Sequence, residues 1–188
     1  MLQSLSKWLL YKRMGWKKDV RFTLPNKAII CLAPHTSNWD FIIGQLYARA
    51  EGLHSNFLMK KEWFVWPLGW MFRKLGGIPV WRDKHTSMTD RLAEYAMRAD
   101  SFQLCVTPEG TRSLNAEWKK GFYYIAMKAK LPIFLYGVDF EKKTIVCSKV
   151  ITPTGDIEKE LREIKLYFKD FKGRHPELFT IGEIKNED

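Results

Sequence analysis

The sequence lacks any apolar run long enough to cross a membrane. Its longest candidate, residues 63–72, is about half of the roughly 20 residues that a transmembrane helix needs, and it contains Pro67 and Gly69. The N-terminal residues show neither a long apolar core nor a small-residue cleavage site, so a secretory signal is not predicted. We therefore expect a cytoplasmic protein without a membrane span.

Cysteine is also scarce. The three cysteines, Cys31, Cys105 and Cys147, are far apart, and each lies inside an apolar run. They show neither the spacing of a metal site nor the even count of a disulfide framework. The sequence therefore predicts reduced, packed thiols and no bound metal. It also contains no P-loop and no serine or cysteine nucleophile in a known catalytic motif.

Positive charge, in contrast, is abundant. The 188 residues include 31 Lys and Arg against 21 Asp and Glu, a formal net charge of +10. The excess is concentrated in residues 1–22, where the only acidic residue is Asp19. A basic segment indicates an anionic partner, which is a phospholipid surface, an acidic cofactor or nucleic acid. The eight tryptophans favour the membrane interface among these.

Residues 1–22 are predicted to form a basic amphipathic N-terminal helix. Its apolar residues fall on one helical stripe: Leu2, Leu5, Trp8 and Leu9. Two interpretations are equally supported, because such a stripe suits a helix lying on anionic lipid and a helix packed on the domain core. The aromatic stretch 63–74 also allows more than one interpretation, because it suits an acyl-chain groove, the membrane interface or a broken core helix.

Apolar runs of strand length alternate with helical segments through the rest of the chain. The strands are expected at 28–33, 56–59, 76–82, 102–106, 133–138 and 144–150. This alternation predicts a single α/β domain over residues 23–175, with a largely parallel mixed sheet flanked by helices. Residues 176–188 are expected to form a loose C-terminal tail.

A histidine stands where the first strand ends and a helix is about to begin, in the segment Pro34-His35-Thr36-Ser37-Asn38-Trp39-Asp40. In open α/β sheets ligands bind at this edge. Asp40 would fix the imidazole tautomer of His35 and support its positive charge, which makes the other ring nitrogen a general base. Ser37 and Asp40 also have the spacing of a helix capping box. From spacing alone the plain cap is favoured, with His35 as a surface turn residue.

Two further strand ends carry unusual polar residues. Arg82 ends a glycine-containing strand, and Glu109-Gly110-Thr111-Arg112 follows strand 102–106. Because parallel strands bring their carboxyl ends to one edge, these segments are expected to meet His35 there. Guanidinium groups and backbone N–H groups of a glycine turn suit a phosphate or an oxyanion. A base and an anion clamp without a protein nucleophile suggest direct group transfer to a substrate hydroxyl.

These residues resemble the motifs of the glycerolipid acyltransferases, whose prototype is 1-acyl-sn-glycerol-3-phosphate acyltransferase. His35 to Asp40 resembles the HxxxxD signature, and Pro108 to Ser113 resembles the PEGTRS block. Residues 77–82 resemble the second block, which ends in a phosphate-binding arginine, and residues 131–133 the fourth, which is linked to the acyl donor. The order and separation of all four blocks agree over roughly residues 28–140.

The resemblance implies a mechanism. His35, oriented by Asp40, would deprotonate a hydroxyl of a lysophospholipid such as 1-acyl-glycerol-3-phosphate. That oxygen would attack the thioester of acyl-CoA or acyl-carrier protein, with no covalent acyl-enzyme, no metal and no other cofactor. The acceptor phosphate would be held by Arg82, Glu109, Gly110, Thr111 and Arg112. The protein would work as a peripheral protein at the inner face of the cell membrane.

The main alternative is a non-catalytic peripheral binder of anionic lipid on the same scaffold. Release of free thiol that depends on a lyso-acceptor separates the two hypotheses, whereas a thioesterase would need no acceptor. A nucleic-acid-binding domain, suggested by charge and aromatic residues, predicts salt-dependent binding to DNA or RNA. It leaves the four ordered blocks unexplained, so no nucleic-acid partner is expected.

Overall fold

The computed structural model describes residues 2–80 and 88–183. Its centre is a seven-stranded sheet in the order β1-β7-β6-β2-β5-β3-β4. All neighbouring strands in it are parallel except β6 and β7. The strands are β1 (Lys17–Val20), β2 (Lys27–Ala33), β3 (Asn56–Lys60), β4 (Gly77–Val80), β5 (Phe102–Val106), β6 (Ile133–Asp139) and β7 (Thr144–Ile151). The predicted α/β fold with a largely parallel mixed sheet is confirmed.

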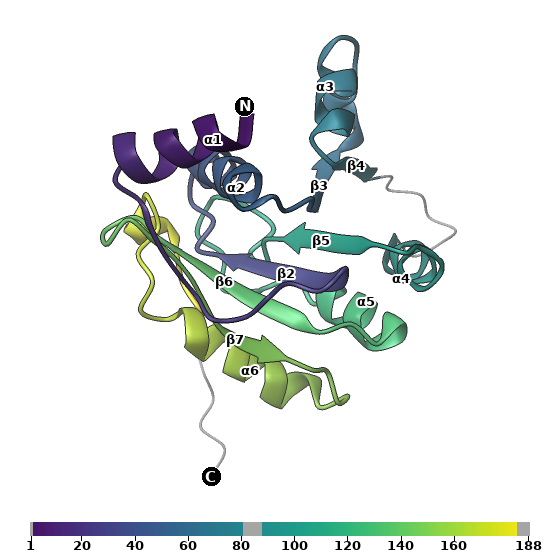
Figure 1. Cartoon of the computed structure of the whole chain (residues 1–188). Helices are drawn as coiled ribbons and strands as arrows, with labels where there is room; N and C mark the ends of the chain where they lie inside the picture. Colours follow the sequence, from purple (N-terminus) through teal and green to yellow (C-terminus); the bar gives the residue numbers. More distant parts are fainter. Residues whose placement is uncertain (1, 81–87, 184–188) are drawn as a thin grey trace.

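Helices cover both faces of the sheet (Figure 1). One face carries α1 (Leu2–Lys7), its π-helical continuation η1 (Trp8–Arg13) and α2 (Asn38–Glu51). The other carries α4 (Met88–Arg98), α5 (Gly121–Ala129) and α6 (Ile157–Phe168). The short 3-10 helices are η2 (Lys61–Trp63) and η3 (Pro176–Leu178). Helix α3 (Leu68–Lys74) projects away from the sheet beside β3 and β4 (Figure 1).

Strand β2 shows why the central strands are apolar without interruption. Ala28 and Ile30 belong to the core cluster under α2, whereas Ile29, Cys31 and Ala33 belong to the cluster under the other helices. Successive side chains of a strand point to opposite faces. A strand covered on both faces therefore needs a continuous apolar run, which is what the sequence provides here. Cys31 and Cys147 are buried in this core as free thiols, and Cys105 is half-buried.

Two terminal segments differ from the prediction. Residues 17–20, assigned to the N-terminal helix, form β1, which pairs in parallel with β7. Its mostly exposed, charged side chains have no apolar periodicity that indicates a strand. The expected loose tail is partly packed, because Phe179 and Ile181 lie against the core and Trp118 donates from Nε1 to the Thr180 carbonyl at 3.1 Å.

The sequence did not decide where the N-terminal apolar stripe and the aromatic stretch 63–74 lie, and both are on the surface. Leu2, Leu5 and Trp8 are exposed, while Leu10 is fully buried in the cluster under α2. Core packing of the N-terminal stripe is therefore wrong for these three residues. The stretch around α3 is also no core helix, because six of its large apolar side chains are exposed: Trp63, Val65, Trp66, Leu68, Trp70 and Met71. Within the described residues, no helix combines the length and the hydropathy that crossing a membrane requires.

Candidate active site

The turn that carries His35 lies between the end of β2 and the start of α2. Nδ1 of His35 is 3.1 Å from Oδ2 of Asp40. The imidazole is 22% exposed, whereas the Asp40 side chain is 1% exposed. The histidine ring therefore reaches solvent at the carboxyl end of the sheet, while its partner carboxylate is shielded.

Asp40 satisfies both interpretations that its spacing left open. Ser37 is the N-cap of α2, and a reciprocal capping box with Asp40 is present. The same Asp40 oxygen that faces His35 accepts from the backbone N–H of Thr36 at 2.7 Å and of Ser37 at 2.8 Å. Because a carboxylate only accepts, the hydrogen bond assigns the ring proton to Nδ1 and leaves Nε2 of His35 as a free acceptor. The capping carboxylate thus also orients a base.

Glu109, on the loop after β5, is buried beside this turn. Strands β2 and β5 are parallel neighbours, so their carboxyl ends lie side by side. Oε1 of Glu109 accepts from the His35 backbone N–H at 2.7 Å, and the residue is 4% exposed. Burial raises the pKa of Glu109 to about 7. This placement gives the Glu109 carboxyl group a supporting role for the His35 backbone, and contact of Glu109 with phosphate stays a prediction.

The other three residues of the predicted clamp lie at the surface beside the turn. Gly110 has φ +66°, a conformation that favours glycine, but its N–H donates to the Thr107 carbonyl at 3.1 Å and is not available to a ligand as expected. Thr111 accepts from the Ser113 N–H at 3.2 Å, and its hydroxyl keeps a proton to donate. Arg112 donates from Nη1 to Oδ1 of Asn38, the first residue of α2. The guanidinium of Arg112 therefore stands next to the His35 turn.

Two further contributors were predicted, Arg82 and the fourth block. Arg82 lies outside the described residues, so its role stays a prediction. The fourth block begins β6 at the opposite edge of the sheet, where the Pro132 carbonyl accepts from the Ile29 N–H at 2.9 Å. Ile29 lies four positions before Ala33, the last residue of β2, a distance of roughly 13 Å along the strand, and His35 lies beyond that end. The fourth block therefore does not touch the atoms next to the imidazole.

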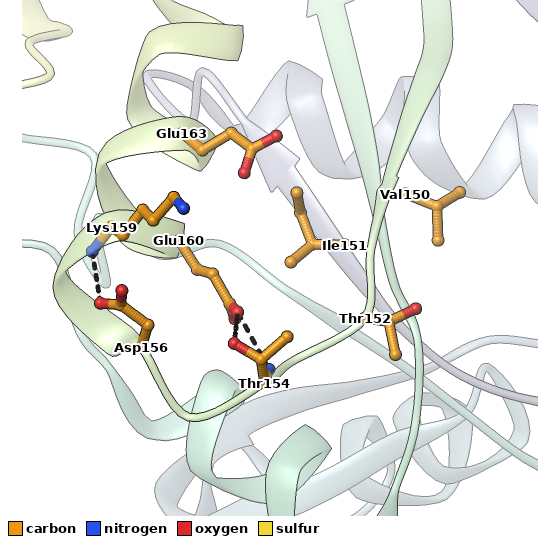
Figure 2. Close-up of a pocket in the computed structure, with 8 residues that line it drawn as sticks. All are labelled: Val150, Ile151, Thr152, Thr154, Asp156, Lys159, Glu160 and Glu163. Carbon is orange, nitrogen blue, oxygen red and sulfur yellow. Dashed lines mark hydrogen bonds between the residues drawn. The ribbon is translucent and has the colours of Figure 1, made fainter.

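A cavity of about 350 Å³ lies near the same opposite edge, between the end of β7 and the start of α6 (Figure 2). Ile151 at the end of β7 pairs with Ile133 at the start of β6, which places the cavity away from His35. The backbone N–H and hydroxyl of Thr154 both donate to Oε1 of Glu160, at 2.9 and 2.6 Å. These polar groups brace the first turn of α6, so the cavity is not part of the candidate site.

Comparison with known proteins agrees with the geometry of the turn. The sequence model of the Acyltransferase family matches residues 17–137, which contain β2, α2, β5 and the loop after it. The chain belongs to the acyltransferase family. Comparison with curated protein sequences finds no significant match.

The acyltransferase fold is also seen in a solved relative. The crystal structure of PlsC, the 1-acyl-sn-glycerophosphate (LPA) acyltransferase from Thermotoga maritima, superposes with a TM-score of 0.61. It is 18% identical, and the match covers 89% of this chain and 75% of that one. At this identity the likeness establishes a shared fold for the two proteins.

Part of this acyltransferase's site was not predicted. The backbone N–H of His175 donates to Oγ1 of Thr36 at 3.1 Å, and the guanidinium of Arg174 lies 5.7 Å from the centroid of the Trp39 ring. Neither His175 nor Arg174 was assigned a role in the site from the sequence. No pattern in the sequence signals this contact, because it joins positions 139 residues apart, outside any motif.

The raised pKa of Glu109 predicts a pH dependence of stability in this acyltransferase. The folded state holds the Glu109 proton up to about pH 7, against 4.5 for the ordinary group. The contribution of this bound proton to the free energy of unfolding is fully present below about pH 4.5 and is lost as the pH rises through about 7. Glu109→Gln keeps an acceptor for the His35 N–H without a charge. We expect chemical denaturation to show a higher free energy of unfolding for this variant than for the unmodified protein above pH 7. As the pH rises from 5, the free energy of unfolding should also decline less in the variant.

The matched control is Glu117→Gln, an exposed position on the same loop. Its stability curve should run parallel to that of the unmodified protein. Parallel curves for Glu109→Gln as well would contradict the buried, protonatable carboxyl group inferred for Glu109.

Proposed function

We propose that this acyltransferase moves a fatty acyl group from acyl-CoA or acyl-carrier protein to a hydroxyl of a lysophospholipid such as 1-acyl-glycerol-3-phosphate. The observation that carries the proposal is the solvent-reaching His35 ring, hydrogen-bonded to buried Asp40 and flanked by the Arg112 guanidinium. A base beside a cation suits an acceptor that carries both a hydroxyl and a phosphate. The fold shared with an enzyme named for 1-acyl-sn-glycerophosphate supports the same acceptor class.

The proposed reaction is a direct transfer. Nε2 of His35 takes the proton of the acceptor hydroxyl while its oxygen forms a bond to the thioester carbonyl carbon. The tetrahedral intermediate collapses with cleavage of the C–S bond, and the leaving thiolate takes the proton from His35. The products are an ester and a free thiol, so proton and electron pairs balance without a covalent acyl-enzyme. Asp40 stabilises the positive charge that the imidazole carries between the two proton transfers.

The acceptor phosphate is assigned to the surface groups beside the turn. Arg112 supplies a guanidinium, which binds phosphate oxygens bidentately, and Thr111 supplies a hydroxyl donor. Arg82 is retained in this proposal from its position in the sequence. The proposed transfer uses no metal in any of its steps.

A lipid acceptor also requires access from a membrane surface, and we propose peripheral attachment at the inner face of the cell membrane. The support is the pair of exposed apolar surfaces, one on α1 and one around α3. Basic side chains accompany both: Lys7, Lys12 and Arg13 near the first, and Arg73 and Lys74 near the second. Apolar and aromatic groups bordered by bases suit the interface of an anionic bilayer.

This attachment predicts an effect of the α3 tryptophans. Trp66 is 89% exposed, and Trp70 is also exposed. Because burial of a large apolar side chain contributes roughly 1.5–3 kcal/mol, we expect Trp66→Ala with Trp70→Ala to weaken binding to vesicles containing phosphatidylglycerol by more than tenfold in a sedimentation assay. Tyr95→Ala, an exposed aromatic on α4 at the opposite face, should bind normally. Equal binding by both variants would contradict the α3 surface as a membrane contact.

The proposed function is tested with acyl-CoA and a panel of lysophospholipids. We expect release of free CoA that depends on the acceptor, and a product whose mass equals acceptor plus acyl group. Thiol release without acceptor would instead indicate a thioesterase. Lipid binding with no release from either acyl-CoA or acyl-carrier protein would indicate a non-catalytic binder.

A further inference from the structure

The segment that follows α6 crosses the carboxyl edge of the sheet, and we call residues 171–175 the C-terminal strap. Its first residue, Phe171, packs where Gly137 of β6 has no side chain, since a Cβ on this glycine would overlap the Phe171 ring. Gly137 pairs with Ala33, two residues before His35. The carbonyl of Lys172 then accepts from the Phe140 N–H at 2.8 Å. The strap is therefore anchored next to the His35 turn.

The middle of the strap packs directly against the His35 turn. A Cβ built on Gly173 would lie 2.6 Å from Oγ1 of Thr36 and 3.1 Å from Cβ of Pro34, so only glycine fits this approach. The Thr36 hydroxyl also accepts from the His175 N–H at 3.1 Å, and Thr36 is 3% exposed. The backbone on both sides of Arg174 is thus fixed against the residue that follows His35.

Arg174 itself reaches the start of α2. Its guanidinium lies over the ring of Trp39, the second residue of α2, while the guanidinium of Arg112 bonds Asn38, the first. Both arginines are exposed, and no ion pair with a described carboxylate occupies either of them. The carboxylates of the turn itself, Asp40 and Glu109, accept backbone N–H groups there. Two uncompensated cations therefore stand beside adjacent residues, close to the proposed base.

We propose that Arg174 is a second phosphate ligand of the acceptor site and, with Arg112, selects a phosphomonoester. The inference rests on the proposed function. A phosphomonoester offers three terminal oxygens and up to two negative charges, enough for two guanidinium groups to bind it at once. A phosphodiester has only one negative charge over two free oxygens, and an uncharged headgroup has none, so both pair less well with two arginines and have a lower relative affinity. Arg174 lies outside residues 17–137, so this second phosphate ligand is contributed by the strap and not by the matched family segment.

The experiment compares Arg174→Ala with Arg174→Lys and with Lys172→Ala, a neighbouring exposed base on the strap. The acceptors are 1-oleoyl-glycerol-3-phosphate and 1-oleoyl-glycerol, presented in the same neutral detergent micelles. A charge-assisted hydrogen bond contributes about 1.5–3 kcal/mol, so Arg174→Ala should raise KM for the phosphate acceptor about 10–100-fold with little change in kcat. KM for 1-oleoyl-glycerol should not change. Lysine should restore part of the loss, and Lys172→Ala should behave as the unmodified enzyme.

Gly173→Ala is a second test of the same site, because the added methyl group displaces the strap from Thr36. It should reproduce the KM effect, and the double variant Gly173→Ala with Arg174→Ala should be no worse than Arg174→Ala alone. Thermal unfolding checks that each variant folds. An unchanged KM in folded Arg174→Ala, or equal losses with both acceptors, would overturn the phosphate role.

A direct binding measurement separates this proposal from the proposed function. Calorimetric titration of 1-oleoyl-glycerol-3-phosphate into His35→Asn measures affinity without turnover. Adding Arg174→Ala to that variant should weaken binding 10–100-fold, and unchanged affinity would overturn the inference even if the enzyme is active. Absence of acyl transfer by the unmodified protein with all acceptors would refute the proposed function, while the titration would still report on Arg174.

Discussion

Replacing His35 with alanine is expected to abolish acyl transfer while leaving the fold intact. The imidazole is partly exposed, and its ring makes one described hydrogen bond, to Asp40, so little packing is lost with it. A general base typically accelerates proton transfer by about 10²–10⁴-fold. Acceptor-dependent release of CoA should therefore fall at least 10²-fold, with the same melting temperature within a few degrees.

A sharper version of this test is His35→Asn. The asparagine amide can donate to Oδ2 of Asp40 as Nδ1 does, yet it supplies no base. His54→Ala, on the exposed loop after α2, is the matched control and should retain full activity. Turnover of folded His35→Asn close to that of the control would refute the general-base role, and loss of activity in His54→Ala would show that the assay responds to other changes.

The sequence was sufficient to place His35 and the loop after β5 at one edge. Continuous apolar runs such as 28–33 indicate strands covered on both faces, and parallel strands bring their carboxyl ends together. That argument predicted that Arg112 approaches the His35 turn, and the Asn38 contact confirms it. Spacing also identified the capping box of Ser37 and Asp40, although it presented as alternatives two roles that one carboxylate performs together.

Other parts of the site could not be predicted, because they depend on tertiary packing. Glu109 stands in a motif of polar residues, and only the pairing of β2 with β5 shows that its carboxyl group is buried under His35. The C-terminal strap meets Thr36 through a glycine contact and a backbone N–H, and neither leaves a periodic or compositional trace. Edge strand β1 was missed for a related reason, since its exposed, charged residues follow no apolar alternation.

The arrangement around Asp40 leads to the second large expected effect. Three N–H groups converge on Oδ2, from the Thr36 backbone, the Ser37 backbone and the His35 ring. Such a carboxylate holds the imidazole in one tautomer before substrate arrives and stabilises the cation that forms during transfer. Asp40→Asn keeps the shape but removes the charge. We expect kcat to fall about 10²–10⁴-fold, as for loss of the orienting carboxylate in serine-protease triads, with an unfolding free energy lower by about 1–2 kcal/mol.

Ser37→Ala separates this catalytic effect from simple loss of the helix cap. Ser37 supplies the other half of the capping box, accepting from the Trp39 N–H at 3.2 Å, and the described hydrogen bond of the imidazole goes to Asp40 instead. Removing such a cap costs about 1 kcal/mol, so the two variants should lose similar stability in chemical denaturation. Only Asp40→Asn should lose turnover. If Ser37→Ala lost as much activity at matched stability, Asp40 would act only by starting α2, because the charge that distinguishes the two variants would have no part in the chemistry.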